Sequence, residues 1–194
     1  GVTFQSGNPL TANDVVYSFQ RMVAIKEGFS WLWDGVVSPE NVKALDEHTV
    51  EFTLNSSYAP FIASLTQLFI VDSEILKANL QDGNFGENKD YGQKYLENNA
   101  AGSGPYKLGK WERGSQMSFV KNDDYWKGWK EGQLEEVQMK IVTEPATVKT
   151  MLNSGSADMV HQWLTADTYK EFAKTEGIIV QEDPSVQLQH FPMN

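Results

Sequence analysis

The sequence contains no cysteine among its 194 residues. Without a thiol the chain forms no disulfide, thiolate zinc site, iron–sulfur cluster or cysteine nucleophile. Only three histidines are present, His48, His161 and His190, and no two of them lie three to five residues apart as metal-binding pairs usually do. We therefore expect neither a metal site nor a cofactor. The missing cysteines leave the cellular compartment open, because cytosolic proteins and many exported bacterial proteins share this trait.

Long apolar runs and catalytic signatures are also missing. No run approaches the roughly 18 apolar residues of a membrane span, and the first residues resemble no signal peptide, so we expect any export signal to have been removed. The chain has no G-x-S-x-G elbow, Walker loop, G-x-G-x-x-G turn, H-E-x-x-H helix or EF-hand loop. The sequence thus predicts a protein that is not an enzyme. A hydrolase with a scattered carboxylate pair remains the remote alternative, since such a pair has no sequence signature.

Positively charged residues are fewer than negatively charged ones. Sixteen Lys and Arg against 26 Asp and Glu give 16 − 26 = −10, with a sequence pI near 4.7. Such a chain is repelled by nucleic acid and by anionic membranes, so we expect no nucleic-acid partner. What is present is typical of a globular protein: 40% hydrophobic and 12% aromatic residues, in a chain long enough to bury a core.

The first part of the chain predicts two helices and a hairpin. Thr11, with Asp14 three residues later, indicates a helix start, and apolar spacing continues the helix over 12–26. Alternation over 41–54 predicts a β-hairpin with His48 in its turn. A second apolar helix from Pro60 to Leu68 should precede a short buried strand at 69–71. Residues 81–101, rich in Gly and polar residues, indicate a surface excursion held by the anchors Tyr91, Tyr95 and Leu96.

The rest of the chain predicts alternating strands and helices. We expect strands at 105–108, 117–120 and 137–142, with Trp126 in the core between two of them. A helix capped by Thr143 should follow, then a strand at 157–160 and a helix that Thr165 caps and Gly177 ends. This order is typical of the α/β class.

Aromatic residues suggest a binding surface. Trp31 and Trp33 follow the first helix, where large aromatic side chains either contact ligands or fold back as a lid on the helix. His161, Gln162 and Trp163 follow the predicted strand at 157–160, at the end of the strand where α/β sheets place their ligands. The sequence leaves both readings open for the tryptophans.

These segments resemble a known family. Residues 1–18 are similar to the pattern F-x-D-G-x-P-L-T-A-x-D-V-x-x-S of the family 5 extracellular solute-binding proteins, the oligopeptide- and dipeptide-binding class. Four more patterns follow in the family's order: V-x-x-x-D-x-x-T-V at 42–50, G-T-G-P-Y-x-L at 102–108, N-x-x-Y-W at 122–126 and L-x-S-G-E-x-D at 152–158. Each pattern is weak alone, but five in order across nearly the whole chain make chance improbable.

The resemblance implies a fold and a function. The fold would be the α/β, periplasmic-binding-protein-like type II (cluster C) architecture in truncated form. Residues 1–71 would belong to the small accessory domain and 72–194 to the first substrate-binding lobe, with the second lobe absent. Such a protein, periplasmic or a cell-surface lipoprotein, captures a peptide or related polar solute between two lobes and delivers it to the membrane permease of an ABC importer. An oligosaccharide or another solute is the alternative, because sugars stack on flat aromatic faces.

The resemblance also implies site residues. Trp31 falls where the family presents an aromatic side chain to the ligand, Gln162 where it presents an amide, and Ser185 and His190 on a last strand where aromatics face the cleft. Together with the residues placed at the strand end, the expected ligand-binding set is Trp31, His161, Gln162, Trp163, Ser185 and His190.

Overall fold

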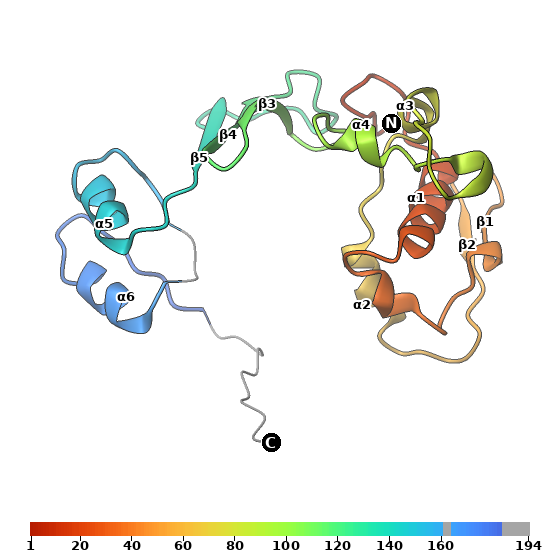
Figure 1. Ribbon diagram of the computed structural model, residues 1–194, viewed down its shortest axis with the longest axis horizontal. Coiled ribbons are helices and arrows are strands. Elements are labelled where there is room, and N and C mark those ends of the chain that lie inside the picture. Colours follow the sequence, from red (N-terminus) through yellow and green to blue (C-terminus); the bar gives the residue numbers. More distant parts are fainter. Residues whose placement is uncertain (161–163, 184–194) are drawn as a thin grey trace. The chain divides into compact units, whose positions relative to one another are not determined.

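The computed structural model describes residues 1–160 and 164–183 (Figure 1). Its contacts divide the chain into two compact units, Gly1–Met139 and Lys140–Asn194. The predicted domain boundary at 71–72 lies inside the first unit. Several hydrogen bonds join the two sides of that boundary, among them those from Ser6 and Asn8 to Asp72.

The first long helix, α1 (Ala12–Ile25), begins as the sequence predicts. The carboxylate of Asp14 accepts hydrogen bonds from the backbone N–H and the hydroxyl of Thr11, at 2.9 and 3.0 Å. Lys26 then adopts a left-handed conformation with φ of 59°, which ends the helix. Phe19 is fully buried in the first hydrophobic core, which it forms with Trp33, Val37, Val42 and Phe61.

The predicted hairpin is present as β1 (Val42–Ala44) and β2 (Val50–Phe52), which pair antiparallel with Lys43 opposite Glu51. His48 lies in the turn, and its backbone N–H donates to the Asp46 carboxylate at 2.8 Å. This hydrogen bond lowers the pKa of Asp46, with a smaller contribution from Thr49. Phe52 brings the hairpin onto α1, since its ring meets Phe19 edge-on at 5.5 Å.

The second predicted helix is short, and the strand expected after it is absent. The chain forms α2 (Phe61–Ser64) and the 3-10 turn η3 (Leu65–Gln67). Residues 69–71 form no strand, and Phe69 is 67% exposed. The physical reason is that this segment has no neighbouring strand: Val71 N–H donates to the Ser18 hydroxyl and Asp72 N–H to the Ala101 carbonyl.

The segment from Gln81 to Glu97 is an ordered loop on the surface, anchored as expected by Tyr91. It contains the turn η4 (Gly86–Asn88) and the single helical turn α4 (Gln93–Leu96), and it follows helix α3 (Ser73–Ala78). The buried Asp90 carboxylate accepts three backbone N–H groups, from Gln81, Gly92 and Lys94. Burial acts to raise the pKa of Asp90, but these hydrogen bonds outweigh it and the pKa is lowered.

Three strands follow in the order β3 (Tyr106–Glu112), β4 (Gln116–Lys121) and β5 (Glu136–Lys140). Strands β3 and β4 pair antiparallel, with a bulge between Leu108 and Trp111. The prediction of Trp126 as a core residue is wrong, because its side chain is 42% exposed. It packs instead on the neighbouring Tyr125 ring, with Lys127 over its face.

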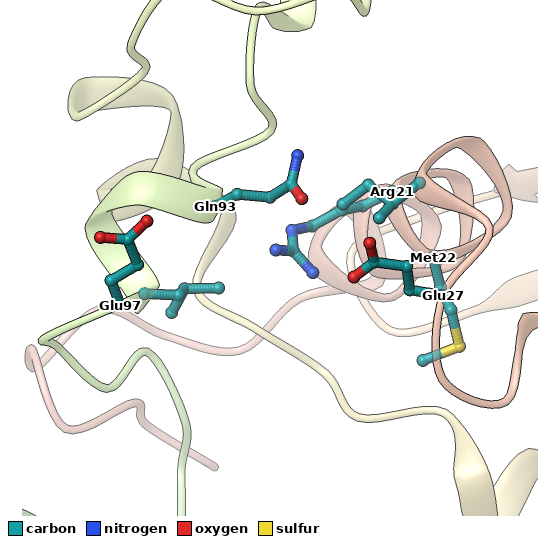
Figure 2. Close-up of a pocket in the computed structure, with 7 residues that line it drawn as sticks. Arg21, Met22, Glu27, Gln93 and Glu97 are labelled. Atoms are coloured by element: carbon teal, nitrogen blue, oxygen red, sulfur yellow. The ribbon is translucent and has the colours of Figure 1, made fainter. Parts of the chain in front are cut away.

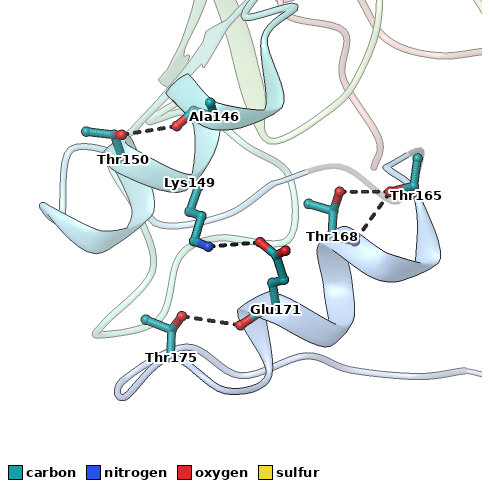
Figure 3. Close-up of polar contacts among 7 residues, drawn as sticks. All are labelled: Ala146, Lys149, Thr150, Thr165, Thr168, Glu171 and Thr175. Carbon is teal, nitrogen blue, oxygen red and sulfur yellow. Dashed lines mark hydrogen bonds and ion pairs between the residues drawn. The ribbon is translucent and has the colours of Figure 1, made fainter.

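The second unit contains α5 (Pro145–Asn153) and α6 (Ala166–Phe172). Figure 3 shows Lys149 of α5 paired with Glu171 of α6 at 2.9 Å, a contact that lowers the pKa of Glu171. The Thr165 hydroxyl accepts the Thr168 N–H at 3.3 Å, which confirms the predicted cap.

Three other expectations for the second unit are wrong. Glu144, not Thr143, precedes the first helical residue, because Pro145 takes the first helical position, where its missing N–H costs nothing. Helix α6 ends at Phe172, before Gly177. No strand forms at 157–160. The described residues are therefore mixed α and β, without the strand expected between α5 and α6.

Candidate functional site

Trp31 and Trp33 lie in the same short 3-10 turn, η1 (Ser30–Trp33), but differ sharply in exposure. A 3-10 helix has three residues per turn, so side chains two positions apart point in widely different directions. Trp33 is 1% exposed and Trp31 is 67% exposed. The sequence left two interpretations open for these tryptophans, a ligand contact or a lid on the helix. The structure shows that Trp33 is the lid and that Trp31 faces solvent.

Trp33 is held in place by contacts with α1 and α2. Its ring meets Phe19 of α1 edge-on, with 5.5 Å between centroids. Its indole Nε1 donates to the Ser64 hydroxyl of α2 at 2.9 Å. Because Trp33 fixes the turn, the backbone that presents Trp31 and the half-exposed Phe29 is anchored to the core. An aromatic surface on a fixed backbone loses little entropy when it binds a ligand.

The other predicted site residues lie outside the described part of the chain. His161, Gln162 and Trp163 fall in the gap at 161–163, and Ser185 and His190 fall beyond residue 183. Their roles in ligand binding stay predictions, as does that of Trp31.

An open groove of about 460 Å³ lies between the C-terminal half of α1 and α4 (Figure 2). Arg21 projects into it beside Glu27, and Gln93 faces them from α4. The remaining lining residues are Met22, Ile25, Leu96 and Glu97. Sequence reasoning missed this groove because its two walls come from distant segments, and no local pattern links them.

Arg21 supplies the positive charge of this groove and also holds the loop at 81–97 against α1. Its Nε donates to the Tyr91 carbonyl at 2.8 Å, which ties the loop at 81–97 to α1. Burial lowers the pKa of Arg21 from its ordinary value, and nearby Tyr17 and the acids Asp90 and Glu27 oppose this effect. One cation, Arg21, and two glutamates, Glu27 and Glu97, give the walls of the groove charges of both signs.

A second groove, of about 480 Å³, lies between α1 and α3 and is lined by Tyr17, Lys77 and Asn88, among others. The Tyr17 hydroxyl is buried and has no hydrogen-bond partner among the described residues. Burial raises the pKa of Tyr17 to about 12, against a smaller lowering by Arg21. The ring of Tyr17 packs on Tyr91 at 5.7 Å, and Lys77 Nζ lies 4.9 Å from its centre.

Residues 1–160 and 164–183 contain neither a cluster of metal-ligating side chains nor a helix that could cross a membrane. In these ranges no three His, Asp or Glu side chains gather in a way that would hold a metal ion. Within the same ranges, no helix has the length and apolar character that a bilayer crossing requires.

Comparison with known proteins identifies the family to which this chain belongs. The family model "Bacterial extracellular solute-binding proteins, family 5 Middle" matches residues 1–194. The chain belongs to this family of solute-binding proteins, which confirms the resemblance of its five sequence patterns.

Two relatives match nearly the whole length of this chain. It is 31% identical to the "Probable D,D-dipeptide-binding periplasmic protein DdpA" of Escherichia coli (strain K12), over 98% of this chain and 35% of that protein. It is 28% identical to the "Heme-binding protein A" of Haemophilus influenzae, over 97% of this chain and 34% of the relative.

A solved structure shows the same fold. The structure of the binding protein AgaA of A. tumefacien R10, in complex with agropinic acid, matches with a TM-score of 0.67 and 24% identity. The match covers 90% of this chain and 33% of that protein. The chain thus spans about a third of the length of the proteins it matches.

Proposed function

We propose that this chain is part of the extracytoplasmic solute-binding component of an ABC importer, which captures an oligopeptide or related polar solute for delivery to a membrane permease. The observation that carries the proposal is the family match over all 194 residues. In this role the protein makes and breaks no bonds. It would work in the periplasm or as a cell-surface lipoprotein, where a solute-binding component meets its permease.

Residues 1–71 would form part of the accessory domain and 72–194 part of the first substrate-binding lobe of a cluster C architecture. Trp31, 67% exposed on an anchored turn, would supply an aromatic contact to the solute. Enclosure between two lobes would provide most of the buried area, since an open surface contacts only one side of a small ligand. Gln162, His190 and the other predicted residues would complete the wall.

The names of the related proteins point to several chemical classes of solute. Relatives are named for a D,D-dipeptide and for heme, and a structural neighbour holds agropinic acid. A peptide is our first choice because the sequence patterns are those of the oligopeptide- and dipeptide-binding class. Exposed Trp31 would also suit a sugar ring, so an oligosaccharide is the second.

The test begins with native mass spectrometry of the full polypeptide that the gene encodes, purified from its own host. A retained peptide would support the proposal, and a copurified sugar would favour the alternative. Calorimetry with the compound so identified then compares wild type with Trp31→Ala. We expect Trp31→Ala to weaken binding by about fivefold to 150-fold, the effect of losing roughly 1–3 kcal/mol from an aromatic anchor.

The matched control is Trp126→Ala, which also removes a partly exposed tryptophan but lies outside the predicted site. We expect Trp126→Ala to bind with wild-type affinity. Unchanged affinity in Trp31→Ala would remove Trp31 from the site. Turnover of generic hydrolase substrates by the wild type would contradict the binding function altogether.

A further inference from the structure

The loop at 81–97 is fastened beyond both of its ends. On the side before it, Asp72 caps α3, and the Asp72 N–H donates to the Ala101 carbonyl at 2.8 Å. On the side after it, the Gln5 N–H donates to the Gly102 carbonyl at 3.0 Å. The segments before and after the loop thus meet, and the loop can move without displacing either of them.

Between these fastened ends the backbone of the loop is strained. Among the described residues, three that are not glycine have a positive φ, and two of them, Lys89 at 49° and Tyr91 at 53°, lie in this loop. The ψ of Lys89 is −107°, far from the left-handed helical region that residues with a Cβ can occupy. Such a backbone raises the free energy of the closed loop and persists only where surrounding contacts enforce it.

Tyr17 of α1 gives a second, independent sign that the closed loop is under tension. Its ring packs on Tyr91 of the loop, and both rings belong to the second hydrophobic core. The Tyr17 hydroxyl is buried and has no hydrogen-bond partner among the described residues. A hydroxyl that is removed from water without a partner destabilises the state that buries it. Water can bond to this hydroxyl once the Tyr91 ring moves away.

Polar contacts hold the loop closed against this tension. From outside the loop, Arg21 Nε donates to the Tyr91 carbonyl at 2.8 Å, and Arg113 donates to the Glu97 carbonyl. Inside the loop, the Asp90 carboxylate accepts the backbone N–H groups of Gln81, Gly92 and Lys94. The closed form is therefore a balance between these hydrogen bonds and the strained backbone with its unpartnered neighbour.

We propose that the loop at 81–97 opens from α1 as one unit while the rest of the first unit stays folded, with the Lys89 backbone and the Tyr17 hydroxyl favouring the open form. Opening breaks the contact between Arg21 and the Tyr91 carbonyl. It also removes one wall of the groove in Figure 2, because Gln93, Leu96 and Glu97 belong to the loop. A compound that binds in this groove holds the loop closed. The inference is independent of the proposed function.

Native-state hydrogen exchange at low urea concentrations tests whether the loop opens separately. The reporter amides are those of Gly92 and Lys94, which the Asp90 carboxylate binds, and the reference is the amide of fully buried Phe19 in α1. Relative to an unstructured peptide, we expect the reporter amides to be at least about 100-fold less protected than the reference and to depend less on urea. Equal protection and equal urea dependence would overturn the proposal, because the loop would then open only in global unfolding.

Two tyrosine variants test the role of the unpartnered hydroxyl. Tyr17→Phe removes that hydroxyl alone, so we expect the reporter amides to exchange about fivefold more slowly than in the wild type. Tyr91→Phe is the matched control, since it removes one hydroxyl from the same pair of rings. The Tyr91 hydroxyl accepts from Asn88 Nδ2 at 2.9 Å, so its loss should make the reporter amides exchange faster. Unchanged or faster exchange in Tyr17→Phe would contradict the proposal.

Two glycine variants test the role of the strained backbone. In Lys89→Gly the relief of strain should exceed the entropy that glycine gains in the open loop, so we expect the reporter amides to exchange about threefold more slowly. Lys26→Gly is the control, because Lys26 also has a positive φ, of 59°, but lies outside the loop at the end of α1. It should leave the reporter amides at the wild-type rate. Equal effects of the two substitutions would overturn the assignment of strain to Lys89.

Discussion

The indole Nε1 of Trp33 donates a hydrogen bond of 2.9 Å to the hydroxyl of Ser64, which in turn donates to the Phe61 carbonyl at 2.7 Å. This relay joins the turn after α1 to helix α2, and all three residues are buried. Together with the packing of Trp33 on Phe19, it holds Trp33 in the core, whereas Trp31 lies on the surface.

Replacing each tryptophan by phenylalanine should separate their roles. Trp33→Phe removes the donor to Ser64 and leaves a cavity, so it should lower the free energy of unfolding by about 1–3 kcal/mol. Trp31→Phe is the matched control and should change it by less than about 0.5 kcal/mol, because Trp31 is exposed. Urea denaturation measures both. A larger loss in Trp31→Phe would mean that Trp31, and not Trp33, is the lid.

Asp72 is a fully buried carboxylate that connects three segments. It accepts hydrogen bonds from Ser6 Oγ at 2.5 Å, from Asn8 Nδ2 at 3.0 Å and from two backbone N–H groups at the start of α3. Asp72→Ala leaves these donors unpaired and removes the helix cap, so we expect a loss of about 3 kcal/mol in the free energy of unfolding.

Asp123→Ala is the control for Asp72→Ala. Asp123 pairs with Lys121 at 3.3 Å but is largely exposed. Exposed ion pairs contribute little, so we expect an effect below about 0.5 kcal/mol. Equal denaturation midpoints for the two variants would show that Asp72 is not the connection described.

Tyr17 should make stability fall at high pH. Its pKa is about 12 in the folded chain, against the ordinary 10.0 expected when unfolded. Below pH 10 both states keep the proton. As the pH rises from 10 through 12 the unfolded chain loses it first, so the free energy of unfolding falls, by an amount on the order of 2–3 kcal/mol.

Tyr17→Phe should reduce this fall, measured as the difference from wild type between pH 8 and pH 11.5. At pH 8 it should cost almost nothing, because the Tyr17 hydroxyl has no partner among the described residues. Tyr91→Phe is the comparison: its hydroxyl accepts from Asn88 Nδ2 at 2.9 Å, so its loss should destabilise the protein already at pH 8. An unchanged alkaline slope in Tyr17→Phe would contradict the raised pKa.

Gly83 allows the loop at 81–97 to close. A Cβ at this position would lie 2.4 Å from the Lys89 carbonyl oxygen and 2.6 Å from Asp90 Cα, closer than atoms can approach. Gly83→Ala should therefore open the loop and cost about 1–3 kcal/mol. Hydrogen exchange at the Gly92 and Lys94 amides, which Asp90 binds, should accelerate. Gly102→Ala, with its nearest atom at 4.0 Å, should leave their exchange at the wild-type rate.

The sequence by itself determined the features that depend on neighbours a few residues apart. Thr11 and Asp14 cap α1 because three residues bring them together on the first turn. Thr165 caps α6 for a similar reason. The hairpin of β1 and β2 follows from alternation around a short polar turn. Family membership was also visible, because it depends on the order of patterns along the chain.

Tertiary structure alone decided the features that depend on distant partners. Residues 69–71 are apolar enough for a strand, but no described strand lies beside them, and the Val71 N–H donates to the Ser18 hydroxyl instead. Arg21 and Gln93 line opposite walls of one groove, and no spacing in the sequence predicts this arrangement. Trp31 and Trp33 have the same side-chain chemistry, and contacts with Phe19 of α1 and with Ser64, 31 positions along the chain, hold Trp33 in the core. Burial and hydrogen bonding to remote residues are properties of three-dimensional proximity, and local sequence patterns carry no record of them.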